Sequence, residues 1–151
     1  MAKAALSFMD AALDEARSAE ARSEVPVGAV IVCDGEIIAR NGNRTRENND
    51  PTAHAEMLVI REAASKLKSE RLSGCDLYVT LEPCAMCAGA ISFARLARLY
   101  FAASDSKGGG VEHGPRFFSQ ATCHHAPDVY SGLSEAESAL ILRDFFKSRR
   151  N

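Results

Sequence analysis

Segments with strand-like and helix-like patterns alternate along this chain, and their order restricts the fold more than any other feature. Short apolar runs rich in β-branched residues predict strands, at residues 29–33, 36–40, 77–81 and 99–102. Longer segments with apolar spacing near 3.6 predict helices, at residues 4–21, over about 15 residues after Pro51, at 84–93 and from Ser134 to Arg150. Because Asp34-Gly35 is a hairpin dipeptide, this order predicts a layered α/β domain with an antiparallel hairpin at one end of its sheet.

Three local patterns add detail to this outline. Ser134 with Glu137 three residues later predicts a capping box at the start of the last helix. The second helix is expected to present one apolar face, made of Met57, Leu58, Ile60, Ala64 and Leu67. Residues 103–132 are the least regular part, and Gly108-Gly109-Gly110 within them lacks any phosphate-loop pattern and is interpreted as a flexible turn.

Length and hydropathy predict where the protein works. A chain of 151 residues suits one folding unit, so residues 1–151 are expected to form a single domain. No apolar run approaches the ~20 residues that span a bilayer, so no membrane partner is expected. The first 24 residues have no signal-peptide core, and a cytoplasmic location is therefore expected, where the five cysteines stay reduced.

Two short segments carry the residue types of a metal site. They are Asp-Pro-Thr-Ala-His-Ala-Glu at residues 50–56 and Leu-Glu-Pro-Cys-Ala-Met-Cys at residues 81–87, each at an expected helix start. Two thiolates from Cys84 and Cys87 and one imidazole from His54 make a three-ligand zinc set, which leaves the fourth position to water. Glu56 next to such a water is suited to exchange its proton, which indicates hydrolytic deamination, and zinc deaminases carry this signature.

Each part of this pattern alone has an ordinary explanation. His54 by itself is typical of a partly buried histidine, and a lone Cys-x-x-Cys is compatible with a redox pair or a closed structural metal site. Only the joint pattern favours catalytic zinc. The adjacent histidines His124 and His125 and the other three cysteines, Cys33, Cys75 and Cys123, are expected to be loop or small core residues without metal.

The chain resembles the bacterial tRNA adenosine deaminases, a family of the cytidine-deaminase-like superfamily. The likeness covers nearly the whole chain, at residues 24–30, 42–44, 50–56, 80–90, 105–107 and 145–150. The resemblance implies a three-layer α/β/α sandwich with a mixed five-stranded sheet, a homodimer and one zinc ion per subunit. It also implies conversion of the wobble adenosine of a tRNA anticodon to inosine, with the anticodon stem-loop as partner.

The resemblance further implies roles for individual residues. His54, Cys84 and Cys87 are the implied zinc ligands, and Glu56 is the implied proton shuttle. The implied substrate contacts are Asn43, Val25, Pro26, Ala55, Asp105, Lys107, Phe145, Arg149 and Arg150. The run at 109–118 departs from the family pattern, so contacts to the bases beside the target are not carried over.

Two alternatives remain open from the sequence. Free-base or nucleoside deaminases of the guanine or cytosine type share the Pro-Thr-Ala-His-Ala-Glu and Glu-Pro-Cys-x-Met-Cys motifs. The tRNA interpretation depends instead on residues 25–30, residues 105–107 and the basic Phe-Phe ending. A non-catalytic zinc-stabilised binding module is the second alternative, and Glu56 argues against it because such a site needs no carboxylate beside an open metal position.

The distribution of charge bears on a nucleic-acid partner. A net charge of −2 argues against such a partner when taken as a sum. The excess acid lies within residues 1–24, however, whereas residues 143–150 hold four basic groups against one acidic group. A second basic cluster is expected at Arg40, Arg44 and Arg46. We therefore expect a small basic patch and a salt dependence with a log–log slope no steeper than about −6.

Overall fold

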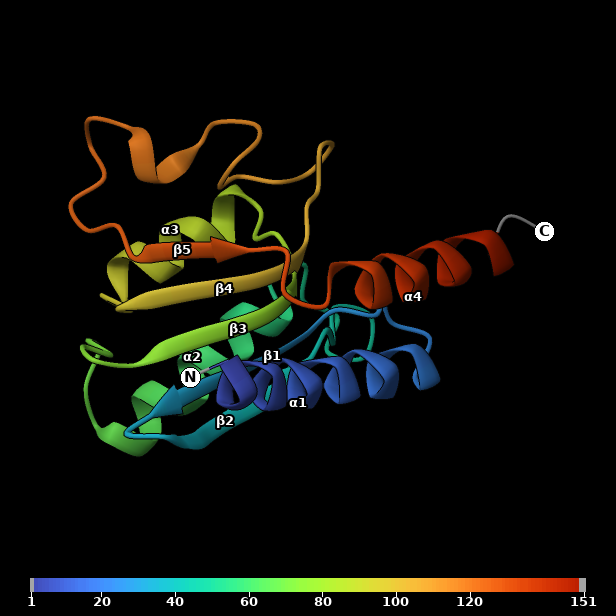
Figure 1. Cartoon of the computed structure of the whole chain (residues 1–151), viewed down its shortest axis with the longest axis horizontal. Coiled ribbons are helices and arrows are strands. Elements are labelled where there is room, and N and C mark those ends of the chain that lie inside the picture. Colours follow the sequence, from blue (N-terminus) through green and yellow to red (C-terminus); the bar gives the residue numbers. More distant parts are fainter. Residues whose placement is uncertain (1, 150–151) are drawn as a thin grey trace.

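The computed structural model describes residues 2–149, in which helices and strands alternate (Figure 1). The elements are α1 (Ala2–Ala21), β1 (Gly28–Cys33), β2 (Glu36–Gly42), α2 (Ala55–Leu67), β3 (Asp76–Leu81), α3 (Ala85–Phe93), β4 (Arg98–Ala103), a 3-10 turn η1 (Phe117–Ser119), β5 (Asp128–Ser131) and α4 (Glu135–Ser148). The strands form one sheet in the order β2-β1-β3-β4-β5. β1 runs antiparallel to both β2 and β3, while β4 runs parallel to β3 and β5.

This mixed sheet confirms the predicted α/β class and the hairpin. Asp34 and Gly35 both have positive φ, at 52° and 80°, which is the turn geometry that matches the twist of a two-residue hairpin. The hairpin returns β2 along the outer side of β1, so β2 is an edge strand. Among the described residues, no helix is long and apolar enough to cross a membrane.

Two apolar layers on opposite faces of the sheet make the three-layer sandwich. Along β1, Ala29 and Ile31 face the core shared with α2 and α3, whereas Val30 and Val32 face the core shared with α1. This alternation follows from the two-residue period of a strand, and it explains why the central strands read as continuous apolar runs. Helix α4 contacts β3, β4 and α1, and so completes the layer that α1 begins (Figure 1).

Helix α1 approaches the sheet very closely at a glycine. A Cβ atom on Gly28 would lie 2.0 Å from the carbonyl oxygen of Ala12 and 2.5 Å from the backbone nitrogen of Ala16. Only a residue without a side chain fits there. The first strand can therefore lie directly under the helix, with Met9 and Leu13 packed beside the contact and fully buried.

Four local predictions were wrong. β5 forms in a segment that local patterns left irregular, because pairing with β4 supplies its conformation. Ser134 has a left-handed backbone (φ 60°) and makes no capping hydrogen bond, while Glu137 pairs instead with Arg17. The buried residues of α2 are Ala55, Glu56, Val59 and Ala63 rather than the predicted stripe, and α4 ends at Ser148, two residues early.

Candidate active site

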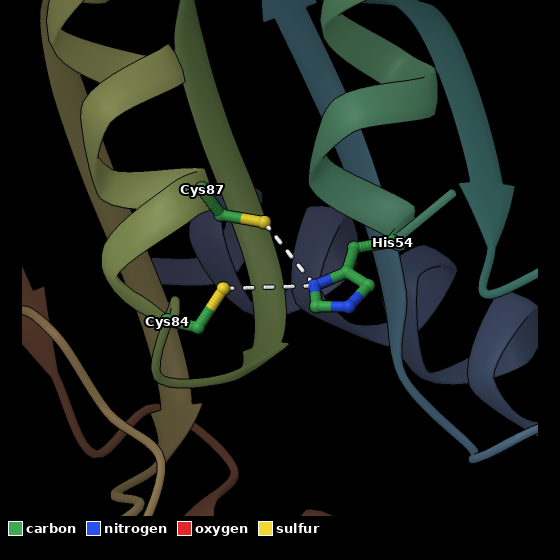
Figure 2. Close-up of side chains that lie close together, drawn as sticks. All are labelled: His54, Cys84 and Cys87. Carbon is green, nitrogen blue, oxygen red and sulfur yellow. Dashed lines mark hydrogen bonds between the residues drawn. The ribbon is translucent and has the colours of Figure 1, made fainter. Parts of the chain in front are cut away.

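Three potential metal ligands converge between the starts of α2 and α3. The side chains of His54, Cys84 and Cys87 each offer one donor atom, and these atoms all lie within 4.8 Å of one another. Figure 2 shows both sulfur atoms directed at the same nitrogen of the His54 ring, which is Nδ1. His54 comes from the connection before α2, Cys84 from the connection before α3 and Cys87 from α3 itself, so the fold brings together residues 30 or more positions apart in the sequence.

Backbone geometry at the two helix starts explains this convergence. His54 and Cys84 are the N-cap residues of α2 and α3, both with extended backbone (φ −72° at each). Cys87 lies in the first turn of α3 and is fully buried. The Oδ1 atom of Asn43 accepts the Ala55 N–H at 2.8 Å and so satisfies one of the free donors at the start of α2. The partial positive charge of both helix N-termini then favours thiolates at the site.

The distances between the donor atoms fit a tetrahedral zinc ion. Zinc binds thiolate sulfur at ~2.3 Å and imidazole nitrogen at ~2.0–2.1 Å, which separates nitrogen from sulfur by about 3.6 Å in a tetrahedron. His54 Nδ1 lies 3.6 Å from the Cys84 sulfur and 3.5 Å from the Cys87 sulfur. Three donors of this kind match the set that leaves one position to water, so the residues present fit zinc.

The same side chains influence one another's protonation. A hydrogen bond from Cys87, and a second from His54, lower the pKa of the Cys84 thiol to about 4. The hydrogen bond with Cys84, together with burial, raises the pKa of Cys87 far above its usual range. The bond to Cys84 also raises the pKa of His54. Their surroundings therefore favour the thiolate form of Cys84 and the neutral thiol form of Cys87.

Glu56 lies in the first turn of α2, two residues after His54. Its side chain lines the same pocket as His54 and Cys84, although only 4% of the residue is exposed. Burial raises the pKa of this carboxyl to about 7. A carboxyl group that takes up and releases a proton near neutral pH is suited to general acid–base work.

A cavity of about 510 Å³ opens above these residues. Apolar side chains and polar loop residues line it in addition to the metal donors, namely Val25, Val27, Asn43, Thr45, Leu81, Glu82, Asp105, Lys107, Gly108, Leu142 and Phe146. The pocket therefore includes the predicted contacts Val25, Asn43, Asp105 and Lys107. Pro26 and Ala55, the other two predicted pocket residues, are buried and lie outside its lining.

The two phenylalanines of α4 take different positions. Phe145 was the predicted substrate contact, but it is 5% exposed and lies outside the pocket lining, whereas Phe146 is 48% exposed and lines the pocket. Arg149 is exposed, and its guanidinium lies 3.9 Å above the Phe145 ring in a cation–π contact. Arg150 lies outside the described residues. Leu142 and Phe146 are one helical turn apart, a spacing that could have indicated their shared face.

Basic residues before the metal motif are largely paired. Arg40 pairs with Glu15 at 2.7 Å, and Arg44 pairs with Glu47 at the same distance. Their charge is thus neutralised locally, and the predicted cluster at 40–46 is weaker than its sequence indicates. Arg46 is exposed, and its backbone N–H donates to the buried carboxylate of Glu24.

Glu82, which sequence reasoning missed, holds the loop that follows β4. Its buried carboxylate accepts backbone hydrogen bonds from Asp105 and from residues 111–113, and these bonds keep its pKa below its usual value despite the opposing effect of burial. Gly108 lies in an exposed turn, as predicted, but Gly109 and Gly110 are buried against Glu82 and Ala85, which does not fit a flexible segment.

Fold and site together define a zinc-binding deaminase, and comparisons with known proteins agree. The cytidine and deoxycytidylate deaminase zinc-binding region matches residues 2–103. The tRNA-specific adenosine deaminase of Agrobacterium fabrum is 70% identical over 143 residues, with 95% of this chain and 94% of that protein covered. The chain therefore belongs to the tRNA-specific adenosine deaminase family within these zinc-binding deaminases.

Two solved structures are similar to this chain in fold. One comes from studies of A-to-I editing by tRNA:A34 deaminases at the wobble position of transfer RNA. It is 71% identical with a TM-score of 0.89, covering 89% of this chain and 98% of that chain. The other is the guanine deaminase of Bacillus subtilis, which is 34% identical with a TM-score of 0.65, covering 96% and 92%. The three-layer sandwich is common to both.

Proposed function

We propose that this protein hydrolyses the 6-amino group of adenosine at the wobble position of a tRNA anticodon, which yields inosine and ammonia. The observation that carries the proposal is the His54-Cys84-Cys87 donor set with Glu56 beside it in one pocket. The 70% identity to the Agrobacterium fabrum tRNA-specific adenosine deaminase supports this substrate. A cytoplasmic location and a single catalytic domain over residues 1–151 are part of the proposal.

The roles of the chain's own residues follow from their positions. His54, Cys84 and Cys87 would hold one zinc ion per subunit, and a zinc ion at such a site supplies a water with a pKa near ~7. Glu56 is placed to accept a proton from such a water, and it would deliver this proton to N1 of the purine and then pass a proton to the departing amine. Its raised pKa near neutrality suits both directions of transfer.

The pocket walls orient the base for this transfer. Val25, Val27 and Leu81 provide apolar contact for a flat purine ring. Because the Oδ1 atom of Asn43 already accepts the Ala55 N–H, the amide N–H groups of Asn43 are left to donate to the nucleoside. Flipping a base out of a single-stranded loop costs less free energy than flipping it out of a duplex, which suits an anticodon loop as substrate.

The outer rim of the pocket is suited to nucleotides beside the target. Lys107 is exposed and lines the pocket mouth next to Asp105, where its ammonium would meet a phosphate. Phe146 offers an exposed ring on the opposite side for base stacking. A homodimer, as the family resemblance implies, is part of the proposal.

One substrate panel tests the proposal against its closest alternative. The guanine deaminase of Bacillus subtilis has the same fold, so a free-base substrate is the competing function. The zinc-loaded protein would be incubated with an anticodon stem-loop carrying a wobble adenosine, and separately with free guanine, cytosine, adenosine and cytidine. We expect inosine only in the RNA. Ammonia released from a free base alone would overturn the tRNA assignment.

Variants of the two helix starts test the residue roles. Glu56→Gln should keep its zinc and lose activity by about 10²–10⁴ or more, because the proton transfer is lost while the ligands remain. Glu62→Gln, on the solvent side of the same helix, is the matched control and should keep full activity. His54→Ala should lose zinc on elemental analysis. A full metal content in that variant would contradict the ligand assignment.

A further inference from the structure

Glu82 is the acceptor for five hydrogen bonds, all from a single loop. Its Oε1 atom accepts the Asp105 N–H at 3.0 Å and a bond from His113 Nδ1 at 2.8 Å. Its Oε2 atom accepts the N–H groups of Val111, Glu112 and His113, at 3.2, 2.9 and 3.1 Å. The side chain itself is 0% exposed, so no water competes for these positions.

The arrangement has the geometry of an anion-binding nest. Three successive backbone N–H groups converge on one oxygen, as they do around phosphates in nest motifs, but here the anion belongs to the protein. A charged acceptor makes each such bond stronger than one between neutral groups. The loop from residue 105 to residue 113 is therefore wrapped around a fixed negative charge supplied by the end of β3.

Two glycines allow the loop to wrap so closely. A Cβ atom on Gly109 would lie 2.4 Å from Glu82 Oε2 and 2.5 Å from the Asp105 carbonyl oxygen. On Gly110 it would lie 2.6 Å from the Ala85 backbone nitrogen. The Gly110 N–H also donates to the Pro83 carbonyl at 2.8 Å. The loop is thus held against the same β3–α3 connection that carries Cys84.

This loop supplies one wall of the substrate pocket. Asp105, Lys107 and Gly108 all line the cavity. The Oδ1 atom of Asp105 accepts the N–H groups of Lys107 and Gly108, at 3.1 and 2.9 Å, so the turn that presents Lys107 is built on Asp105. Asp105 is in turn fixed through its own N–H by Glu82. Glu82 is therefore connected to the pocket mouth by a short chain of hydrogen bonds.

We propose that Glu82 is a positioning residue for RNA binding, whose buried carboxylate holds the 105–113 loop so that Asp105 and Lys107 meet the nucleotides around the target base. This proposal rests on the proposed function, because it assigns those side chains to an RNA substrate. Glu82 acts on binding rather than on the proton transfer, which belongs to Glu56.

The isosteric variant Glu82→Gln tests this role. An amide group would point two donors at N–H groups of the loop, so the loop would leave its position. With the anticodon stem-loop as substrate, we expect KM to rise roughly tenfold or more, because the loop loses its hydrogen bonds to a charged group and no longer holds Asp105 and Lys107 in position. Zinc content should stay at the wild-type value. The kcat should change little, because the contacts that are lost bind the ground state and the transition state equally. Amide hydrogen exchange at Asp105 and residues 111–113 should become faster.

A double-mutant cycle separates positioning from general damage. If Glu82 acts through the loop, then Glu82→Gln should raise KM much less in a Lys107→Ala background than in the wild type. Glu24→Gln is the matched comparison, because Glu24 is also a buried carboxylate that holds a loop, but a different one at 45–47, whose Thr45 lines the pocket as well. The increase in KM caused by Glu24→Gln should be the same in the Lys107→Ala background as in the wild type.

Gly109→Ala gives a second measurement if Glu82→Gln does not fold. Its Cβ would clash with the Glu82 carboxylate and the Asp105 carbonyl and so separate the loop from Glu82 without removing the charge, and KM should rise in the same way. An unchanged KM in either folded variant, or full additivity with Lys107→Ala, overturns the proposal. A wild-type protein inactive on the stem-loop would refute the proposed function instead, while the hydrogen-exchange result would still report whether Glu82 holds the loop.

Discussion

Glu24 holds a second loop that lines the pocket, and its replacement should lower the stability of the protein in a pH-dependent way. Only 1% of Glu24 is exposed, and its carboxylate accepts the Thr45 hydroxyl at 3.3 Å and the N–H groups of Arg46 and Glu47 at 3.2 and 2.8 Å. These bonds, with the nearby Arg22 charge, hold the pKa of Glu24 below its usual value, although burial alone would raise it. Thr45 lines the pocket, so this loop is part of the site.

The change Glu24→Gln removes the charge and turns one acceptor into a donor. Losing hydrogen bonds to a buried charged group costs roughly 1.5–3 kcal/mol at neutral pH. For a chain of this length that corresponds to a fall in Tm of about 3–12 °C, at ~2–4 °C per kcal/mol. The loop at 45–47 should also lose protection from hydrogen exchange, because the Arg46 and Glu47 N–H groups bond to different oxygens and one of these oxygens is replaced by the amide nitrogen.

The pH dependence gives the sign of this effect. The folded pKa of Glu24 is lowered, so its contribution is fully present above the unfolded value of about 4.5 and is lost as the pH falls through the folded pKa. The stability difference between wild type and Glu24→Gln should be constant from pH 7 to about 5.5 and should close below pH ~4.5. Acid loss of the metal affects both proteins alike and cancels in the difference.

Urea denaturation followed by circular dichroism at each pH measures this difference. Glu36→Gln, at an exposed position at the start of β2, is the control and should show no gap at any pH. A gap of the same size at pH 3 and pH 7 would refute the argument, because it would mean that the charge of Glu24 makes no contribution. The absence of a gap at pH 7 would refute it equally.

Three further outcomes follow from the packing and the charges. Gly28→Ala should lower the free energy of unfolding by about 1–3 kcal/mol or more through its clash with Ala12, whereas Gly89→Ala, whose Cβ would meet nothing closer than 3.8 Å, should not lower Tm. Phe146→Ala should weaken stem-loop binding with little change in Tm, because the Phe146 ring lines the pocket. Phe145→Ala should lower Tm with little change in binding, because the Phe145 ring is buried outside the pocket. Filter binding between 50 and 200 mM salt should give a log–log slope shallower than about −6, and a steeper slope would require a larger basic surface.

Sequence patterns predicted the central strands correctly, because burial in the sheet determines their residue types. The central strands are covered on both faces, so their apolar runs appear directly in the sequence. β5 has the burial pattern of an edge, with only Val129 half-buried among its four residues, and its conformation comes from pairing with β4. Ser134 follows Gly132 in a turn where both residues have positive φ, and that backbone prevents the cap its sequence predicts.

At the site, spacing predicted that His54, Cys84 and Cys87 lie together, but not which residues support them. His-x-Glu and Cys-x-x-Cys are local patterns at helix starts, so they were recognisable without the fold. The bonds of Glu82 reach 23 to 31 residues along the chain, and no local pattern records them. Glycine has two opposite uses, as a flexible hinge and as a point of close approach, and only the structure shows that Gly109 and Gly110 have the second.

The position of the metal donors at two separate helix starts has a mechanical consequence. An ion held by His54 and Cys84 would cross-link positions 30 residues apart and pin α2 to α3 across their shared core. Such a cross-link resembles a disulfide in restricting the unfolded chain, with the difference that a chelator or acid can undo it. Occupancy by the ion would then control activity and stability together. A chain that has lost the ion would be inactive and would also unfold more readily.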